Sequence, residues 1–494
     1  MIASIPTPHI DWFALSPALA LLGAGSVDLL AAVLFRRRRG FAAAVCLLGF
    51  AGAIVAAALL YSHSADGHGV IADAIQRDRF GALAEMIVGG AGVLAVLVSY
   101  SEPMPDDHIA EYYALLAWAG AGMAFLATAS NLMTLFLGLE WFSISLYILC
   151  AIDVDLAGSL EAGLKYLIVG GFGSAMLLFG SALVYGSTGE LEFHRIAQAI
   201  QAQGLTHDAL LVAGLALVIG GLGFKASAAP FHMWTPDVYE GAPTPVTAFM
   251  SAATKTVALM LALRVLVTAF PQEARLWTIA VAVIACASLA VGNLAALVQR
   301  NLKRMLAYSS ISHAGFMLIA VSANNALGGR VLLYYLIPYS AMSIGSFAVV
   351  AARERELNQP VTLNNLSGFG WERPLLGVSM AVFMLGFAGL PLTGGFVGKF
   401  YVFSAAYRHG WIWLVIVGVA ATAVSLYYYL GVIRALFMRQ AEELQLAPVV
   451  GGSPPRELLL QTAVAGAVAV TVGSFFAVQP LIDGAKHAAR ALPF

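Results

Sequence analysis

Long apolar segments follow one another along almost the whole chain, with short polar loops between them. Each segment is close to the ~20 residues that an α-helix needs to cross a bilayer. Only 11% of the 494 residues are charged and 60% are hydrophobic, more apolar surface than a soluble core can bury. The segments lack the alternation of β-barrel strands. The sequence therefore predicts an all-α polytopic membrane protein. It excludes a soluble enzyme, a disordered chain and, since the net charge is only −1, a nucleic-acid-binding protein.

We predict fourteen membrane-spanning helices. Their approximate bounds are 13–35, 41–60, 80–99, 111–129, 131–150, 161–185, 209–240, 244–269, 275–298, 302–322, 328–351, 374–408, 411–434 and 457–478.

Two of these spans are too long for one straight helix, and each holds a Gly-, Ala- and Pro-rich stretch at mid-membrane. The stretches are GGLGFKASAAPFHMW (Gly220–Trp234) and GFAGLPLTGGFVGKF (Gly386–Phe400). Discontinuous helices at corresponding places in two halves of a chain are typical of transport proteins. In the second stretch we expect Pro391, Gly394 and Gly395 to keep the helix broken and hydrated. Proline removes a helical hydrogen bond, and glycine permits backbone angles closed to other residues.

Two pairs of polar residues recur at nearly the same spacing. Glu140 and His313 are 173 residues apart, and Lys225 and Lys399 are 174 apart. This spacing predicts two repeats of five helices, the second inverted because five is odd. The predicted segments are an N-terminal three-helix segment (1–110), a first five-helix repeat (111–269), a second, inverted repeat (275–438), and a C-terminal helix and tail (439–494).

The loop after the first span carries the strongest orientation signal, the run Arg36, Arg37, Arg38 and Arg39. Because Lys and Arg favour the cytoplasmic side, this run predicts that the first loop lies inside. With an even number of spans, both termini then lie outside. Met1–Asp11 holds no Lys or Arg and does not resemble a cleaved signal peptide.

Five titratable side chains lie at or near mid-membrane. Glu140, Lys255 and His313 are central in their spans, and Lys225 and Lys399 lie at the two breaks. A charge at the bilayer centre costs roughly 2.5–3.5 kcal/mol on insertion scales, so it needs a partner or a function. A nearby carboxylate favours the charged form of a buried lysine, so Glu140 can tune the proton affinity of Lys225. This row of five titratable side chains predicts a path for protons through the membrane. The alternative is a set of static buried pairs that fix helix packing.

Other charged residues carry weaker signals. Glu161 and Lys165 form an i,i+4 pair at the inner end of their span, where they either snorkel to the interface or join the relay. Arg264 lies five residues from the outer end of its span and is predicted to snorkel. Asp28 and Glu85 lie outside the repeats, which favours a structural or partner-facing role.

No pattern of metal or cofactor ligands is present in the sequence. Cys46, Cys150 and Cys286 are isolated in apolar runs, without a CxxC or His/Cys cluster for zinc or an iron–sulfur centre. His313 is the one histidine central in a span, which disfavours a haem with two histidine ligands. The run GGFVGKF (Gly394–Phe400) lacks the spacing of a phosphate-binding loop. We therefore expect no metal and no cofactor on this chain.

Three stretches resemble the antiporter-like membrane subunits of respiratory complex I. They are HMWTPDVYEGAPTPVTAFMSAATKTVAL (His232–Leu259), NLKRMLAYSSISHAGFML (Asn301–Leu318) and GLPLTGGFVGKFYVF (Gly389–Phe403). The resemblance covers nearly the whole chain. Within that family the run TPDVYEGAPTPVTAF is most similar to the N subunits of bacterial proton-pumping NADH–quinone oxidoreductases.

The resemblance implies a set of site residues and a direction of transport. The residues that match the polar positions of the family are Glu140, Glu161, Lys165, Lys225, Lys255, His313 and Lys399. Protons are then expected to enter from the inner side and to pass Lys225, Lys255 and His313. They are expected to leave outward at Lys399.

The resemblance also implies where the redox chemistry takes place. Electrons are expected to pass from NADH to quinone in other subunits, which hold FMN and iron–sulfur clusters. This chain would be a non-redox translocase subunit in the bacterial inner membrane. Its partners would be other membrane-arm subunits, including other antiporter-like ones. The alternatives are a subunit of a secondary sodium/proton antiporter or membrane-bound hydrogenase complex, and a scaffold that conducts nothing.

Overall fold

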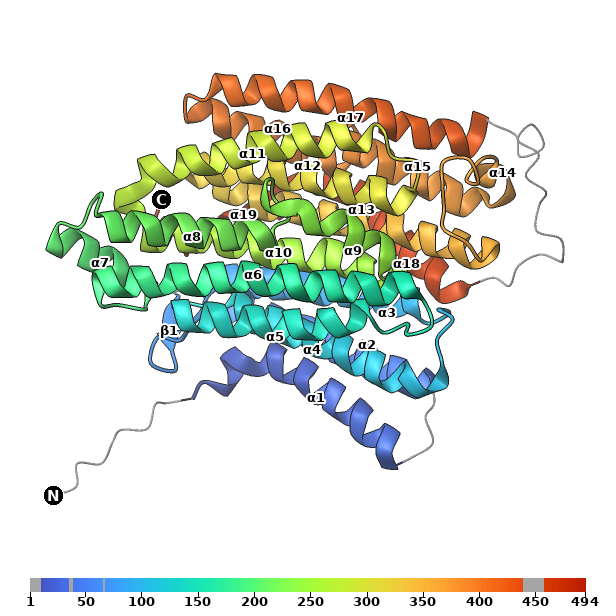
Figure 1. The fold of residues 1–494 in the computed structure, drawn as a ribbon, viewed down its shortest axis with the longest axis horizontal. Coiled ribbons are helices and arrows are strands. Elements are labelled where there is room, and N and C mark those ends of the chain that lie inside the picture. The colour runs from blue at the N-terminus through green and yellow to red at the C-terminus, as the bar shows by residue number, and fades with distance from the viewer. Residues whose placement is uncertain (1–9, 35–38, 65–66, 439–456) are drawn as a thin grey trace.

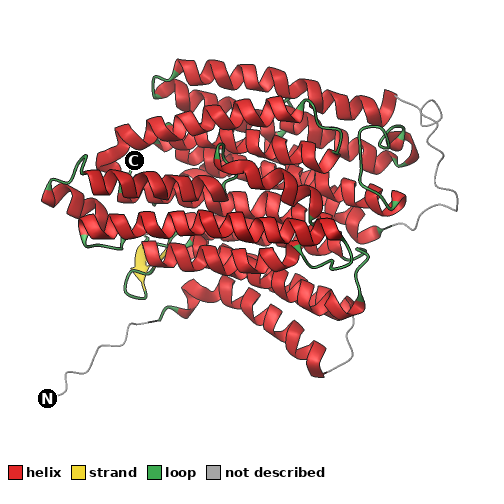
Figure 2. Cartoon of the chain, viewed as in Figure 1, coloured by secondary structure: helices red, strands yellow, loops and turns green. Residues whose placement is uncertain are grey.

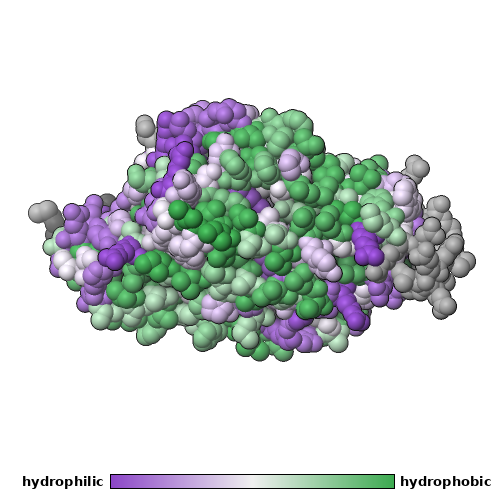
Figure 3. Space-filling model, turned by 90° about the horizontal axis from the view of Figure 1, so that it is seen from above, coloured by the Kyte–Doolittle hydropathy of each residue, from purple (hydrophilic) through white to green (hydrophobic). Residues whose placement is uncertain are grey.

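Long helices run side by side through the whole molecule (Figure 1, Figure 2). The computed structural model describes residues 10–34, 39–64, 67–438 and 457–494. Within these residues the only sheet is one short antiparallel hairpin. Apolar residues cover most of the face in Figure 3, with hydrophilic patches toward its two ends. The predicted fold class, an all-α polytopic membrane protein, is confirmed.

The N-terminal part consists of three long helices and the hairpin. These elements are α1 (Trp12–Leu34), α2 (Arg39–His63), β1 (His68–Val70), β2 (Ile75–Arg77) and α3 (Arg79–Ser99).

The next part holds five spans, of which the fourth is broken. Its elements are η1 (Asp106–His108), α4 (Ile109–Ala127), α5 (Leu132–Cys150), α6 (Ala157–Thr188), α7 (Phe193–Gln203), α8 (Ala209–Lys225), η2 (Phe231–Trp234), α9 (Thr235–Gly241) and α10 (Thr244–Ala269).

Five further spans, again with the fourth broken, and two C-terminal helices complete the chain. The elements are η3 (Pro271–Glu273), α11 (Ala274–Ala296), α12 (Leu302–Ser322), α13 (Ala326–Leu357), α14 (Phe369–Glu372), α15 (Pro374–Ala388), α16 (Gly394–Arg408), α17 (Ile412–Met438), α18 (Leu458–Phe476) and α19 (Val478–Ala489).

The predicted spans correspond closely to these helices. Among the described residues, 12 helices are long and apolar enough to cross a membrane, and α8 and α15 are shorter apolar helices. The latter two are the first parts of the two predicted broken spans. The sequence patterns missed the hairpin and the short helices α7, α14 and α19.

Polar caps explain why several spans begin where they do. Asn131, Asn301 and Asn325 precede α5, α12 and α13, and each side chain accepts a hydrogen bond from a backbone N–H three residues later. Such caps satisfy N–H groups that lack a partner within the helix.

Helices α10, α12 and α13 form the core of the molecule. Every residue of α10 is buried, as are nearly all residues of α12 and most residues of α13. Side chains on α10 therefore face other helices on all sides. This burial separates the polar groups of the core from lipid.

Both predicted breaks are present, but the expected role of two glycines was wrong. Gly394 and Gly395 lie inside α16, and the left-handed φ values of the second break belong to Gly389 (79°) and Leu392 (73°). A Cβ at Gly395 would lie 2.0 Å from the Gly386 carbonyl oxygen. These two glycines therefore permit close packing of α16, rather than unusual backbone angles.

The equal spacing of the lysines does not mark equivalent positions. Lys225 is the last residue of α8, before the first break, whereas Lys399 is the sixth residue of α16, after the second break. The two broken spans correspond to each other, but their lysines lie on opposite sides of the breaks. The predicted division at 1–110, 111–269, 275–438 and 439–494 stays a prediction.

The described chain begins and ends at the same end of the molecule. In Figure 1 the start of α1 and the end of α19 lie toward the end that carries α7 and β1, and α14 lies at the opposite end. This arrangement agrees with an even number of spans. Arg36, Arg37 and Arg38 lie outside the described residues, so the side of the membrane stays a prediction.

Candidate functional site

Four of the predicted central groups are fully buried and one is half-buried. The exposed fraction is 3% for Lys225, 0% for Lys255, 1% for His313 and 4% for Lys399. Glu140 on α5 is half-buried. The helices α5, α8, α10, α12 and α16 thus contribute one group each.

Serine hydroxyls hold the first two groups. The Glu140 carboxylate accepts a hydrogen bond from Ser174 on α6, and the Lys225 ammonium donates to the Ser143 hydroxyl at 2.7 Å. Among the described residues the carboxylate and the ammonium make no direct ion pair. Ser143 in turn donates to the carbonyl of Leu139. Each charged group therefore has a serine hydroxyl as its hydrogen-bond partner, and the tuning of Lys225 by Glu140 stays a prediction.

Aromatic rings surround the Lys225 ammonium. Its Nζ lies 5.4 Å from the ring centroid of Phe142 and 5.7 Å from those of Tyr147 and Tyr166. Tyr166 stacks on Trp234, with 4.4 Å between centroids. The electron-rich ring faces attract a cation without supplying a formal charge.

The ends of the broken helices hold the other two lysines. Lys255 Nζ donates to the carbonyl of Ala226, the C-cap of α8, at 3.1 Å. Lys399 Nζ donates to the carbonyls of Phe387 at 2.8 Å and Ala388 at 3.3 Å, at the end of α15. Because the last carbonyls of a helix lack intrahelical partners and carry partial negative charge, they suit an ammonium. Both breaks therefore present a helix C-terminus to a buried lysine.

His313 lies between two tyrosines. Its Nδ1 is 2.9 Å from the Tyr335 hydroxyl, and its Nε2 is 3.2 Å from the Tyr429 hydroxyl. Both imidazole nitrogens therefore have a phenol partner. The sequence pattern missed these tyrosines, as well as the serines at Glu140 and Lys225, because hydroxyl residues are common in apolar helices.

Glu161 and Lys165 lie apart from the buried row. Lys165 Nζ is 2.7 Å from Glu161 and 2.9 Å from Asp237. The Lys165 side chain is 43% exposed and that of Glu161 is 64% exposed. Arg304 contacts the same Asp237 at 2.7 Å. These residues form a surface cluster at one end of the molecule, not a part of its interior.

A cavity of about 970 Å³ opens beside this cluster. Its lining includes loops and helix ends from both five-helix parts. The charged residues that line it are Glu102, Asp153, Asp155, Glu161, Lys165, Asp237, Glu240, Lys303, Arg304, Glu354 and Arg355. A polar, open cavity of this kind can admit water to the ends of α6 and α9.

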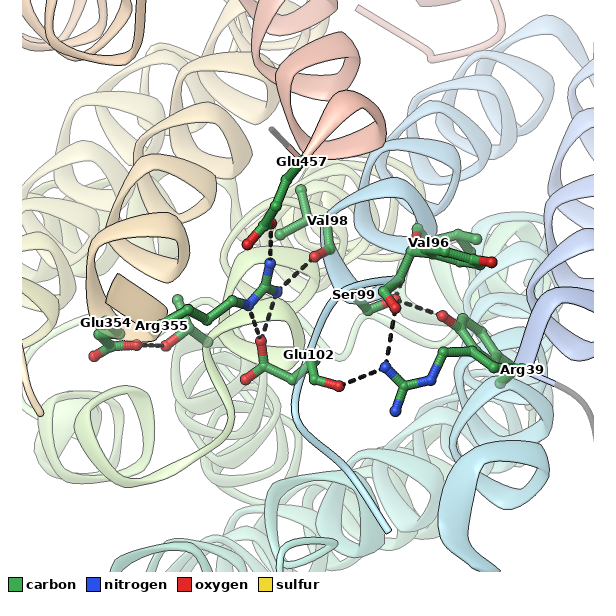
Figure 4. Close-up of polar contacts among 11 residues, drawn as sticks. Arg39, Val96, Val98, Ser99, Glu102, Glu354, Arg355 and Glu457 are labelled. Atoms are coloured by element: carbon green, nitrogen blue, oxygen red, sulfur yellow. Dashed lines mark hydrogen bonds and ion pairs between the residues drawn. The ribbon is translucent and has the colours of Figure 1, made fainter. Parts of the chain in front are cut away.

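Arg355 closes one side of this cavity. Its guanidinium contacts the carboxylates of Glu102 and Glu457 and the carbonyl of Val98 (Figure 4). Burial raises the pKa of Glu102 above its usual value, and the neighbouring Arg355 acts in the opposite direction. Arg39 donates to the Glu102 carbonyl at 2.8 Å. The N-terminal helices, α13 and the start of α18 are thereby joined.

The prediction that Arg264 snorkels is wrong. Arg264 is 2% exposed, and its Nη2 donates to both carboxylate oxygens of Asp78, at 2.8 and 2.7 Å. Its Nη1 donates to the Ala127 carbonyl at 3.1 Å. Asp78, in the short polar segment before α3, is the partner of Arg264. The sequence of α10 alone does not indicate this partner. Asp28 and Glu85 are buried, at 1% and 3% exposure, which excludes the partner-facing role.

The described residues contain no group of three or more His, Cys, Asp or Glu side chains placed to hold a metal ion. Cys46, Cys150 and Cys286 are free. The expectation that this chain carries no redox cofactor stays a prediction.

Comparisons with known proteins agree on one family. A family model described as "NADH:quinone oxidoreductase/Mrp antiporter, TM" matches residues 129–425. The NADH-quinone oxidoreductase subunit N of Trichlorobacter lovleyi is 42% identical over 409 residues, which cover 82% of this chain and 83% of that protein. Subunit N of Granulibacter bethesdensis is 37% identical over 488 residues, which cover 98% of this chain and 100% of that protein.

Solved structures show the same fold. A chain of respiratory complex I from Thermus thermophilus has a TM-score of 0.78 and 32% identity, covering 94% of this chain and 98% of that chain. A chain of the Mrp complex from a Dietzia species has a TM-score of 0.85 at 22% identity and covers 97% of both chains, a likeness of fold alone. This chain therefore belongs to the subunit N family of NADH–quinone oxidoreductases, the antiporter-like membrane subunits of respiratory complex I.

Proposed function

We propose that this chain translocates protons as a non-redox membrane-arm subunit of an NADH–quinone oxidoreductase. Its path is the row of Glu140, Lys225, Lys255, His313 and Lys399. Electrons pass from NADH to quinone in other subunits, which hold FMN and the iron–sulfur clusters. The chain then lies in a bacterial inner membrane, with both termini on the outer side and other antiporter-like subunits as neighbours.

One observation carries this proposal: among the described residues, no carboxylate contacts the ammonium groups of Lys225, Lys255 and Lys399. Neutral oxygens hold the ammonium groups of Lys225, Lys255 and Lys399. A static buried charge that only fixes packing is normally paired with an opposite charge, since an unpaired one is strongly destabilising. Neutral partners suit both the ammonium and the free amine, so these lysines can lose and regain a proton without breaking an ion pair. The static alternative is therefore disfavoured.

The polar cavity is the proposed inner entry. Glu161 and Lys165 line it, and Tyr166, the residue after Lys165, has its ring 5.7 Å from the Lys225 ammonium. Protons move from this cavity to Lys225, then along α10 and α12 through Lys255 and His313. Lys399 is the proposed outer exit.

The experiment compares Lys225→Ala and Lys225→Arg in the assembled complex. Arginine stays charged at any usable pH and cannot release a proton. Both variants should therefore lower proton-coupled quinone reductase activity about tenfold or more, since a missing proton-transfer group commonly costs that much. Lys486→Ala, on α19, is the matched control and should keep wild-type activity. Wild-type activity in a fully assembled Lys225→Ala complex would overturn the relay role.

A further inference from the structure

His313 is hydrogen-bonded to two other titratable side chains, one at each ring nitrogen. Nδ1 lies 2.9 Å from the Tyr335 hydroxyl on α13, and Nε2 lies 3.2 Å from the Tyr429 hydroxyl on α17. Tyr335 is fully buried and Tyr429 is 1% exposed. A neutral imidazole has one donor and one acceptor nitrogen, and a phenol can play either part. In each of these two hydrogen bonds, either the imidazole nitrogen or the phenol can therefore be the donor.

The Tyr429 contact extends toward the start of α12. Its hydroxyl is 2.5 Å from the Ser309 hydroxyl, one helical turn before His313 on α12. Ser309 borders a small enclosed space that is also lined by Ser310, Ser343 and Tyr339. Within the described chain the buried Tyr339 hydroxyl has no hydrogen-bond partner. This space is too narrow to hold a water molecule, so the hydroxyls of Ser309 and Tyr429 meet directly.

The Tyr335 contact extends toward Lys399. A Cβ at Gly398 would lie 2.5 Å from the Tyr335 ring, so the ring packs directly on the backbone of α16 beside Lys399. Lys399 itself reaches back to the end of α15, and its ammonium lies 4.4 Å from the ring centroid of Phe316, three residues after His313. One end of the hydrogen-bonded chain therefore packs beside Lys399, and the other lies at Ser309.

We propose that Tyr429 and Tyr335 are proton-relay residues that give His313 a second inlet, separate from Lys255, and direct its proton to Lys399. The chain of four side chains is Ser309, Tyr429, His313 and Tyr335. This proposal rests on the proposed function.

The proton balance of one passage is simple. Ser309 gives its hydroxyl proton to the Tyr429 oxygen, and Tyr429 gives its own hydroxyl proton to Nε2 of His313. The proton on Nδ1 of His313 then passes to the Tyr335 oxygen. The original hydroxyl proton of Tyr335 leaves toward Lys399. One proton enters at Ser309, near the start of α12, and one leaves at Tyr335. No bond other than O–H and N–H changes, and no electron moves.

The test replaces each phenol by a phenyl ring, which removes one oxygen and keeps the shape. Tyr429→Phe and Tyr335→Phe should each lower NADH-driven proton pumping by the assembled complex about tenfold. That factor corresponds in free energy to one buried hydrogen bond. The matched control is Tyr334→Phe. Tyr334 is the neighbour of Tyr335, equally buried, and its hydroxyl donates to the Ser474 carbonyl at 2.8 Å, away from His313.

A second readout separates relay from packing. If the hydroxyls carry the proton, the ratio of pumping rates in H₂O and D₂O should change in both relay variants and stay at its wild-type value in Tyr334→Phe. Should Tyr429→Phe fail to assemble, Ser309→Ala breaks the same chain at its inlet and should give the same result. Wild-type pumping and an unchanged isotope ratio in Tyr429→Phe and Tyr335→Phe would overturn the proposal that these tyrosines relay protons to and from His313. If Lys225→Ala is inactive in the same assay, the proposed function would still stand.

Discussion

At the scale of the residue, the buried charges are held mainly by neutral groups. Ser143 holds Lys225, backbone carbonyls hold Lys255 and Lys399, and two phenols flank His313. These partners lower the cost of a buried charge without fixing it, because they also accommodate the neutral form. Arg264 is a contrasting case, because its guanidinium forms a bidentate ion pair with Asp78. The same chain thus contains both a fixed buried ion pair and titratable groups without ion pairs.

A substitution at Glu140 tests whether its charge or its shape matters. Glu140→Gln keeps the shape but removes the charge that favours the ammonium form of Lys225, so quinone reductase activity should fall about tenfold. Glu140→Asp should keep part of the activity, since the carboxylate persists one methylene further back. Ser174→Ala leaves the charge but removes its hydrogen bond, and an intermediate loss is expected. Equal activity of Glu140→Gln and wild type, at equal subunit content, would favour packing over charge.

The sequence identified the charged members of the site but not their partners. Lys255 and His313 are conspicuous because charged groups are rare at membrane depth. Their partners are a carbonyl of Ala226 and the hydroxyls of Tyr335 and Tyr429, which lie on other helices. Such contacts depend on how helices pack, and no spacing along one helix encodes that. Arg264 was misjudged for the same reason, since Asp78 lies 186 residues away in the chain.

At the scale of the element, the two breaks are cation sites as well as bends. The C-terminus of α8 binds Lys255 and the C-terminus of α15 binds Lys399. Composition predicted the existence of both breaks, because Gly and Pro cluster there. It could not predict which positions take left-handed angles. Leu392 does so although leucine disfavours that conformation, and the helical Gly394 and Gly395 do not.

Gly389→Ala tests the role of the second break. Gly389 has φ of 79°, and an added Cβ would lie 2.8 Å from Cδ of Lys399. The methyl group should displace the lysine from the Phe387 and Ala388 carbonyls and lower proton pumping about tenfold, although Lys399 is intact. Gly410→Ala is the control, because Gly410 has φ of 90° with no neighbour within 4 Å of its added Cβ. The two variants share the backbone strain. Equal pumping in both would mean that the contact with Lys399 does not matter.

At the scale of the whole molecule, fourteen spans could be predicted because each needs only length and hydropathy. The small elements could not be predicted from length and hydropathy. The helices α7 and α19 and the hairpin are short and partly polar, and they form on the surfaces that the spans provide. The hydrogen-bond network of Arg355 joins α3, α13 and α18, which are far apart in the sequence. Only the arrangement of the complete bundle brings these groups together around the cavity.

The central claim is that protons cross the membrane through this chain, between Lys225 at one end of the row and Lys399 at the other. The most direct test is NADH-driven proton pumping by the reconstituted complex carrying Lys225→Ala and Lys399→Ala together, with subunit content measured alongside. The account predicts a pumping rate below about a tenth of wild type in a fully assembled complex, the loss expected when proton-transfer groups are missing. Wild-type pumping by the assembled double variant would contradict it and leave the chain a scaffold.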